Sequence, residues 1–234
     1  MGKVGTAQLR QALGEDPEGV VRMLHLIYEP ITFLHPSRLE ELFPSDEVLE
    51  ILGSSRRPWL AANQFVRKRL RLKLTQPTPL TEPRHSLFFE PLSILRQLAL
   101  HAGAILLSEE IRRVIRRRER NELLACLGKD IYNFVLRKAF FFRVHSMPLA
   151  FGEDGRSLAE RTVTAGRRCV AACLFDLPPA LRERFPLKFP VDERWPVVRG
   201  TGKQEADVLW QFLVRLRRHI VAAKKGVQHH GVGT

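Results

Sequence analysis

The segment Leu92–Leu107 constrains the fold of this chain more than any other segment. It spans about four helical turns, and its strongly polar interruptions are Arg96 and His101. Seven apolar residues share one helical face, and further apolar residues cover most of the remaining circumference. The seven are Leu92, Leu95, Leu98, Ala99, Ala102, Ile105 and Leu106. A helix that is apolar on nearly every side belongs in a protein interior, so we expect other elements to pack around it.

A second helix with a basic side is predicted to follow directly. Ser108 offers a hydroxyl to the unpaired amides at its start, and Glu109 and Glu110 place carboxylates at its positive end. The spacing puts Ile111 and Ile115 on its apolar face. The opposite face, the first candidate protein-contact site, carries Arg112, Arg113, Arg116 and Arg117.

The charge balance favours an anionic partner for this basic face. Lysine and arginine number 38 against 25 acidic residues, which gives a net charge of +13. Such a field attracts nucleic acid, an acidic membrane face or an acidic protein surface. A nucleic-acid site has the charge here but lacks aromatic interleaving, and a membrane-surface helix lacks apolar density opposite the arginines. A protein-docking face needs only an acidic partner, because arginine can bind a carboxylate with two parallel hydrogen bonds. A fourth interpretation, beside nucleic acid, membrane and protein, is a face that is merely solvated.

Three consecutive phenylalanines, Phe140, Phe141 and Phe142, form the second candidate contact site. They end a helix that is predicted to begin at Asp130. Three adjacent phenylalanines can hardly all face solvent in a soluble monomer. Two interpretations therefore stay open, packing into the core and an exposed patch for a partner.

The predicted fold class is mainly α, with about eight helices in one compact domain and at most a few short extended segments. The extended segments are Leu72–Leu74 and Leu187–Val191. Three prolines in residues 75–83 indicate an extended linker and a candidate subdomain boundary. The predicted organisation is a frayed lead-in at 1–16, the helical domain at 17–225 and a disordered tail at 226–234.

The three cysteines lack the rhythm of a disulfide framework, which suits a reducing compartment. Cys169 and Cys173 lie four residues apart on one helical face, and a metal site would need two more ligands nearby. Buried structural thiols are therefore the favoured interpretation, and we predict no metal and no cofactor. Leu92–Leu107 is shorter than the roughly 20 residues that a bilayer requires, and Met1–Glu15 has no apolar signal core. These features predict a cytoplasmic protein that does not span a membrane.

Sequence patterns of catalysis are missing from the chain. Carboxylates lie at predicted helix starts or beside arginines, where they are not paired for acid–base work. The chain contains no Gly-x-Ser-x-Gly, zinc-protease, Walker or Rossmann pattern. We therefore expect a binding protein without enzymatic activity, and a basic helical nucleic-acid-binding protein is the alternative to a protein-binding role.

Three segments, taken in order, resemble those of one family. Tyr28–Leu39 is similar to a segment P-x-x-Y/F-L-H-P-S-x-L, and Leu100–Arg113 is similar to G-x-x-L-x-x-x-x-I-R-R. Leu181–Pro190 is similar to L-x-x-R-x-x-L-x-L-P and precedes a final amphipathic helix. The family is that of the SctK/YscK-type proteins, the sorting-platform accessory proteins of bacterial type III secretion. The run of arginines between Ile111 and Arg120 and the strong positive charge of the chain depart from that family's pattern.

The resemblance implies a mostly helical adaptor for protein transport and virulence, peripheral at the cytoplasmic face of the inner membrane through the secretion apparatus. In the family, the adaptor links the cytoplasmic domain of an SctD-like inner-membrane ring protein to an SctQ-like pod protein. An indirect contact with the SctL stator and the SctN ATPase is an option. No small-molecule substrate is implied, and the basic face would then meet acidic patches on the ring domains or the pod.

Overall fold

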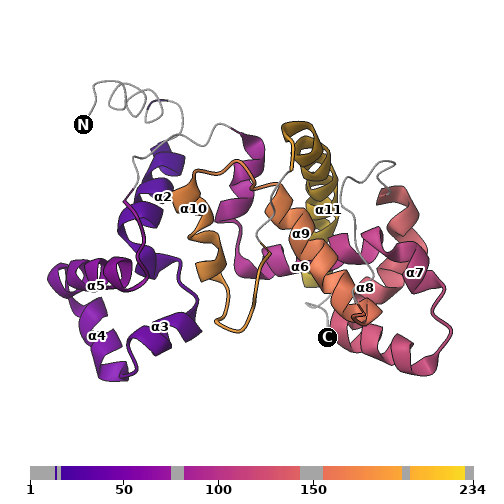
Figure 1. The fold of residues 1–234 in the computed structure, drawn as a ribbon, viewed down its shortest axis with the longest axis horizontal. Coiled ribbons are helices and arrows are strands. Elements are labelled where there is room, and N and C mark those ends of the chain that lie inside the picture. Colours follow the sequence, from indigo (N-terminus) through magenta and orange to yellow (C-terminus); the bar gives the residue numbers. More distant parts are fainter. Residues whose placement is uncertain (1–13, 15–16, 75–81, 143–154, 197–200, 230–234) are drawn as a thin grey trace. The chain divides into compact units, whose positions relative to one another are not determined.

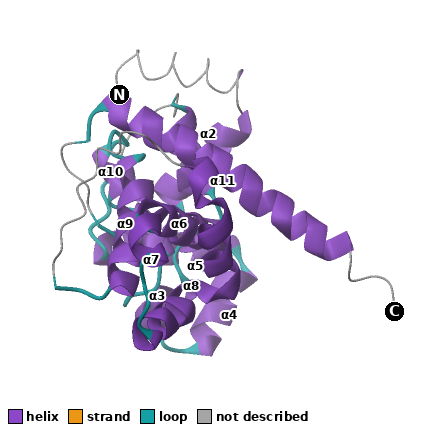
Figure 2. Ribbon diagram, turned by 90° about the vertical axis from the view of Figure 1, so that its right-hand side faces the viewer, coloured by secondary structure: helices purple, strands orange, loops and turns teal. Residues whose placement is uncertain are grey.

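The computed structural model describes residues 14, 17–74, 82–142, 155–196 and 201–229, of which 223–229 are described by their backbone alone. Within these ranges the regular structure is helical throughout and contains no strand (Figure 2), so the mainly-α prediction is confirmed. The described ranges hold ten α-helices and four short 3-10 helices, which exceeds the predicted number of about eight helices. The last helix continues to His229, into the segment that was expected to be disordered.

The chain divides into two compact units, where one helical domain over residues 17–225 was predicted with a candidate subdomain boundary at residues 75–83. Unit 1 consists of residues 1–83 and 177–194, and unit 2 of residues 84–176 and 195–234. The chain therefore passes between the units three times. The first passage follows Pro83 at the end of the predicted linker, of which residues 75–81 lie outside the described residues.

Unit 1 is built from two pieces of sequence that complete one core. Its helices are α2 (Pro17–Tyr28), η1 (Pro30–Thr32), α3 (Pro36–Leu42), α4 (Asp46–Ser54), α5 (Arg56–Arg69), α10 (Pro179–Arg182) and η4 (Phe185–Lys188). Ile31, Leu34, Ala62 and Val66 are buried at the centre of this core, and Leu187 from the second piece packs against them. The segments predicted as extended are not strands, because Leu187 lies in a 3-10 helix and Leu72–Leu74 are irregular.

Unit 2 is arranged around α6 (Leu92–Leu106), as the apolar circumference predicted. Its other helices are η2 (Pro83–Phe89), α7 (Ser108–Arg112), α8 (Arg117–Lys138), η3 (Ala139–Phe142), α9 (Leu158–Ala172) and α11 (Lys203–His229). Leu95, Leu98 and Ala102 of α6 are fully buried. Helices α8, α9 and α11 all contact α6, and of the three contacts the one with α9 is the most extensive (Figure 1).

Two glycines allow the close crossing of α6 and α9. A Cβ atom added to Gly103 would lie 1.9 Å from the carbonyl oxygen of Thr162, and one added to Gly166 would lie 1.7 Å from that of Ala99. Both distances are far below van der Waals contact. The two backbones therefore touch directly, and no residue other than glycine fits at either position without separating the helices.

The prediction of a single basic helix after Ser108 is wrong. Helix α7 ends at Arg112, the chain turns, and α8 begins at Arg117. Ile115, which was expected on an apolar face, is 94% exposed in the break. Continuing the helix would have set arginines three and four residues apart around β-branched residues, and both effects lower helix stability. The end of α7 is also fixed, because Arg161 of α9 holds Glu110 with two hydrogen bonds of 2.7 and 3.1 Å.

Candidate functional site

The four predicted contact arginines surround the break between α7 and α8 and do not share one helical face. Arg112 is the last residue of α7, and its guanidinium lies 3.4 Å from the carbonyl oxygens of Val135 and Leu136. Arg116 precedes α8 and lies 3.5 Å from a carboxylate oxygen of Glu119. Arg113 and Arg117 are also exposed. The four side chains thus form an exposed basic turn, which we call the arginine turn.

The phenylalanine triplet divides between the two interpretations that the sequence left open. Phe140 and Phe141 are 63% and 74% exposed. Phe142 is half-buried, and its ring centroid lies 5.5 Å from that of Phe134 and 5.7 Å from that of His219. The first two side chains are therefore largely exposed, while the third packs against the interior of unit 2.

An open groove of about 840 Å³ lies between α6, α8 and α11. Leu127, Ile131, Phe134 and Ile220 supply its apolar surface. Its rim carries the exposed side chains of Lys129, Arg137 and Lys138, and among its described lining residues Asp130 supplies the one carboxylate. Gly128 also lines it, with φ of 78°, a left-handed conformation that glycine adopts without strain and that interrupts α8 at this point. The three basic lining residues all follow this kink in the chain.

Two histidines flank Phe134 inside this groove. The ring centroid of His101 lies 5.2 Å from that of Phe134, and the ring centroid of His219 lies 4.8 Å from it. Burial lowers the pKa of His101 despite the hydrogen bond that its Nδ1–H donates to the carbonyl of Gln97, and the nearby His219 lowers it further. Burial and the charge of Lys138 lower the pKa of His219 as well. Both rings are therefore neutral at physiological pH, and the positive charge of the groove comes from its rim.

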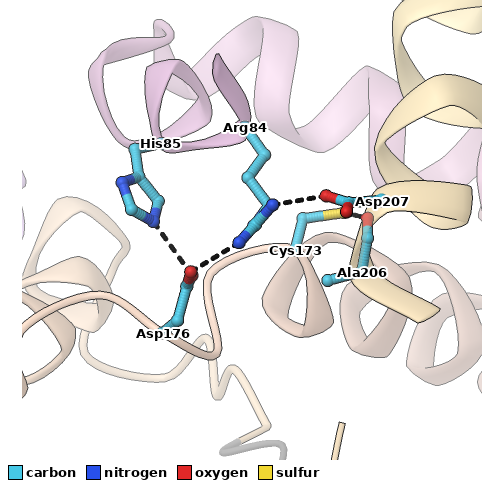
Figure 3. A network of polar contacts seen from close by, with 6 residues as sticks. All are labelled: Arg84, His85, Cys173, Asp176, Ala206 and Asp207. Carbon is cyan, nitrogen blue, oxygen red and sulfur yellow. Dashed lines mark hydrogen bonds and ion pairs between the residues drawn. The ribbon is translucent and has the colours of Figure 1, made fainter. Parts of the chain in front are cut away.

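A second polar cluster in unit 2 centres on Arg84, whose side chain is 1% exposed (Figure 3). Its guanidinium is paired with the carboxylates of Asp176 and Asp207. His85 donates a hydrogen bond of 2.9 Å from Nε2 to Asp176. Burial acts to raise the pKa of Asp176, but the hydrogen bonds from Arg84 and His85 outweigh burial and hold that pKa below its ordinary value. The cluster is a paired and hydrogen-bonded ion network, the form in which buried charges are tolerated.

The thiol of Cys173 lies beside this network and contacts the carbonyl oxygen of Ala206 at 3.9 Å (Figure 3). Burial raises its pKa well above the ordinary value and raises the pKa of Cys169 to about 12. Both side chains are thus protonated and enclosed, as structural thiols are. Among the residues that the structure describes, no three histidine, cysteine or acidic side chains gather as metal ligands would. No helix in the described part of the chain is long and apolar enough to cross a membrane.

Sequence reasoning missed both the groove and the Arg84 network. The groove combines residues from three helices spread between Gln97 and Ile220, and no local pattern marks them. Arg84, Asp176 and Asp207 are equally scattered, with Arg84 just after a proline-rich segment that indicated only a linker. The one local indication of the basic groove was Lys129, a basic residue that follows the run of arginines ending at Arg120.

Comparisons with protein-family models, with curated proteins and with solved structures find no match to this chain.

Proposed function

We propose that this chain is a non-enzymatic adaptor that joins two other proteins within a bacterial type III secretion apparatus. One observation carries the proposal: two of the segments that resemble the SctK/YscK family pack against each other in unit 1, although about 150 positions separate them. Arg38 donates a 2.7 Å hydrogen bond from Nε to the carbonyl of Phe189, and the His35 amide donates one of 3.0 Å to Leu187. Hydrogen bonds between the two resembling segments thus help to join the two pieces of sequence that form unit 1.

The third resembling segment supports the proposal in unit 2. Its Gly103 allows the α6–α9 crossing, and its Ile111 is fully buried. In the resembling segment Leu181–Pro190, the equally buried Arg184 donates hydrogen bonds to the carbonyls of Leu26, Ala180 and Lys73. It thereby joins three stretches of unit 1. A shared framework of this kind is what a common fold requires. It leaves the surface free to differ between relatives, as the arginine turn does here.

The proposed partners are an SctD-like inner-membrane ring protein and an SctQ-like pod protein, and the proposed location is the cytoplasmic face of the inner membrane. An adaptor needs at least two contact surfaces. The arginine turn and the groove with Phe140 and Phe141 offer two exposed surfaces of different chemistry, one mainly cationic and one mixed apolar and basic. Surfaces of this kind set the orientation and rate of association with acidic partners, and their contribution falls with salt.

Pairwise binding tests the adaptor proposal directly. The purified chain is mixed with the cytoplasmic domain of the ring protein and with the pod protein from the same genome, and complexes are detected by size-exclusion chromatography. We expect one ternary complex containing all three proteins. In the host cell, deletion of the gene is expected to abolish recruitment of a fluorescent pod protein to the secretion apparatus. Normal recruitment in the deletion strain would overturn the proposal.

A nucleic-acid-binding role is the second candidate, favoured by six arginines between Ile111 and Arg120 that lie in or next to the arginine turn. An electrophoretic mobility shift with random duplex DNA separates the two roles. A nucleic-acid site predicts tight binding whose logarithm falls steeply and linearly with the logarithm of salt concentration. The adaptor role predicts no shift at physiological salt.

A further inference from the structure

We infer that the groove between α6, α8 and α11 binds an acidic helical segment of a partner protein through one apolar anchor residue. The inference rests on the proposed adaptor function and specifies one of its two contacts. Three independent features of the described residues carry it: the apolar interior of the groove, its basic rim, and the two exposed phenylalanines next to it.

The interior of the groove is suited to an apolar side chain. Phe134 at its floor is almost completely buried, and Leu127, Ile131 and Ile220 lie around it. Both neighbouring histidines have lowered pKa values, so the floor presents no positive charge at physiological pH. An aliphatic or aromatic side chain that enters loses water-exposed area without desolvating a charge, which is the usual basis of an anchor residue.

The rim selects for acidic residues around that anchor. Lys129, Arg137 and Lys138 are exposed and lie within about two and a half turns of α8. Among the described residues that line the groove, Asp130 is the one that is acidic. A partner segment with carboxylates on both sides of its apolar residue would therefore meet complementary charge, and a second copy of this chain, with its own +13, would meet repulsion.

Phe140 and Phe141 extend the apolar surface beyond the groove. Phe142 contacts both Phe134 and His219, so the exposed pair continues directly from the residues that form the floor. Exposed apolar patches bordered by polar residues mark protein-interaction sites. An amphipathic helix that puts one residue in the groove could place another, one or two turns along, on the Phe140–Phe141 rings.

Nucleic acid fits the same groove less well. Single-strand binding relies on bases that stack on free aromatic faces. The ring of Phe134 is already surrounded by His101, His219 and Phe142 at centroid distances between 4.8 and 5.5 Å. A base entering the groove would meet a ring that already contacts three others, whereas an aliphatic side chain does not require stacking on a ring face.

Fluorescence anisotropy tests the inference with a defined probe. The probe is a labelled 16-residue peptide with leucine at helical spacing i, i+3, i+4 and i+7 and glutamate at most other positions. Two control peptides replace the leucines by serine or the glutamates by lysine, and a 16-nucleotide single-stranded DNA is the fourth probe. We expect the acidic leucine peptide to bind the wild-type chain most tightly.

A matched pair of charge reversals locates the binding. The first variant combines Lys129→Glu, Arg137→Glu and Lys138→Glu at the groove, and the second combines Arg56→Glu, Arg57→Glu and Arg69→Glu at exposed positions of α5 in unit 1. Both change the net charge equally. We expect the groove variant to lose at least about tenfold in affinity and the α5 variant less than about threefold. Phe141→Ser, at an exposed position, is expected to weaken binding severalfold while the circular dichroism spectrum stays that of the wild type.

Several outcomes would overturn the inference. Equal losses in the two triple variants would show attraction by net charge alone. Equal affinity for the serine peptide would remove the apolar anchor, and tighter groove-dependent binding of the DNA would assign the site to nucleic acid. If the groove variant still forms the ternary complex with the ring and pod proteins, the groove inference fails and the adaptor proposal stands. If the peptide binds the groove and neither the ring protein nor the pod protein binds the chain, the groove inference stands and the adaptor proposal fails.

Discussion

At the scale of single residues, each unit contains a fully buried arginine, Arg84 in unit 2 and Arg184 in unit 1, and the two charges are accommodated in different ways. Arg84 is neutralised by two carboxylates, whereas Arg184 in unit 1 is held by three backbone carbonyls, with distances of 3.2 Å to Leu26 and 2.7 Å to Lys73. A charge without a buried counter-ion persists only when its hydrogen bonds are nearly complete. Removing the arginine would in turn take one hydrogen-bond donor from each of the three carbonyls.

Arg184→Met should therefore destabilise unit 1 strongly. Methionine fills much of the volume but leaves the carbonyls of Leu26, Ala180 and Lys73 without this donor, and we expect a loss of about 2–4 kcal/mol in the free energy of unfolding. Urea denaturation followed by circular dichroism measures the loss. The control is Arg182→Met at an exposed position two residues earlier, for which the change should stay below about 0.5 kcal/mol. Similar midpoints for the two variants would refute the assigned role of Arg184.

The buried thiols predict a simple chemical result. Cys169 and Cys173 are fully buried, and burial raises the pKa of each, so neither offers a thiolate to a reagent near neutral pH. Half-buried Cys126 also has a raised pKa because of burial. With Ellman's reagent at pH 7.5 we expect at most one slowly reacting thiol in the native chain and three in 6 M guanidinium chloride. Rapid modification of two or more native thiols would contradict the structure.

At the scale of helices, α6 and α9 cross with their backbones in direct contact at Gly103 and Gly166. Gly103→Ala would bring a Cβ atom against backbone on the opposite helix, and backbone cannot move aside as a flexible side chain can. We expect a loss of more than about 3 kcal/mol or failure to fold. Gly53→Ala in α4, where an added Cβ meets nothing within 4 Å, should be neutral or stabilise by about 0.5–1 kcal/mol. Thermal melting of both variants measures the contrast, and similar melting temperatures would contradict the close approach.

The contact of α6, α8 and α11 around Phe134 predicts a loss of stability at mildly acidic pH. Because the folded-state pKa values of His101 and His219 lie below the ordinary value of 6.5, the unfolded chain takes up protons first as pH falls. Their contribution to stability is complete above pH 6.5 and is lost as pH falls through the folded-state values. Lys129, Arg137 and Lys138 near the groove reinforce this direction, and Asp130 opposes it.

Melting temperatures between pH 7.5 and 5.0 measure this dependence. We expect the wild-type melting temperature to fall by several degrees. The double variant His101→Gln with His219→Gln should start from a different value but show a flatter dependence. A wild-type profile that is flat or rises toward pH 5 would contradict the assignment of neutral histidines.

The helices also show what the sequence could and could not predict. Burial of α6 was predictable, because apolar residues around a whole helix leave it no surface suited to water. The break after Arg112 was not, since Val114 and Ile115 continue the apolar spacing in register and the opposing effects amount to a few tenths of a kcal/mol per pair. The groove could not be predicted either. Its walls meet only after α6, α8 and α11 have packed, and no spacing within one helix encodes that meeting.

At the scale of the whole molecule, residues 177–194 should be essential to unit 1 and dispensable for unit 2. Replacing this piece by a short Gly-Ser linker removes Leu187 and Arg184 from unit 1 but keeps Asp176 with Arg84, and Trp195 near Arg167 at 5.9 Å. We expect limited trypsin digestion to cleave α2–α5 at least about tenfold faster, because local unfolding exposes the chain to protease. Cleavage within α6–α9 should be unchanged. Protection of α2–α5 in the deletion variant would show that the first piece folds by itself.

The interrupted sequence of unit 1 also sets an order of events during synthesis. The ribosome releases residues 1–83 first, yet the residues that close their core, among them Arg184 and Leu187, are translated about a hundred codons later. At elongation rates of about 5–20 residues per second, the nascent N-terminal helices wait several seconds with apolar surface uncovered. Such a polypeptide should depend on ribosome-associated chaperones more than one whose first unit is continuous. Slowing translation between codons 83 and 177 should accordingly reduce its soluble yield.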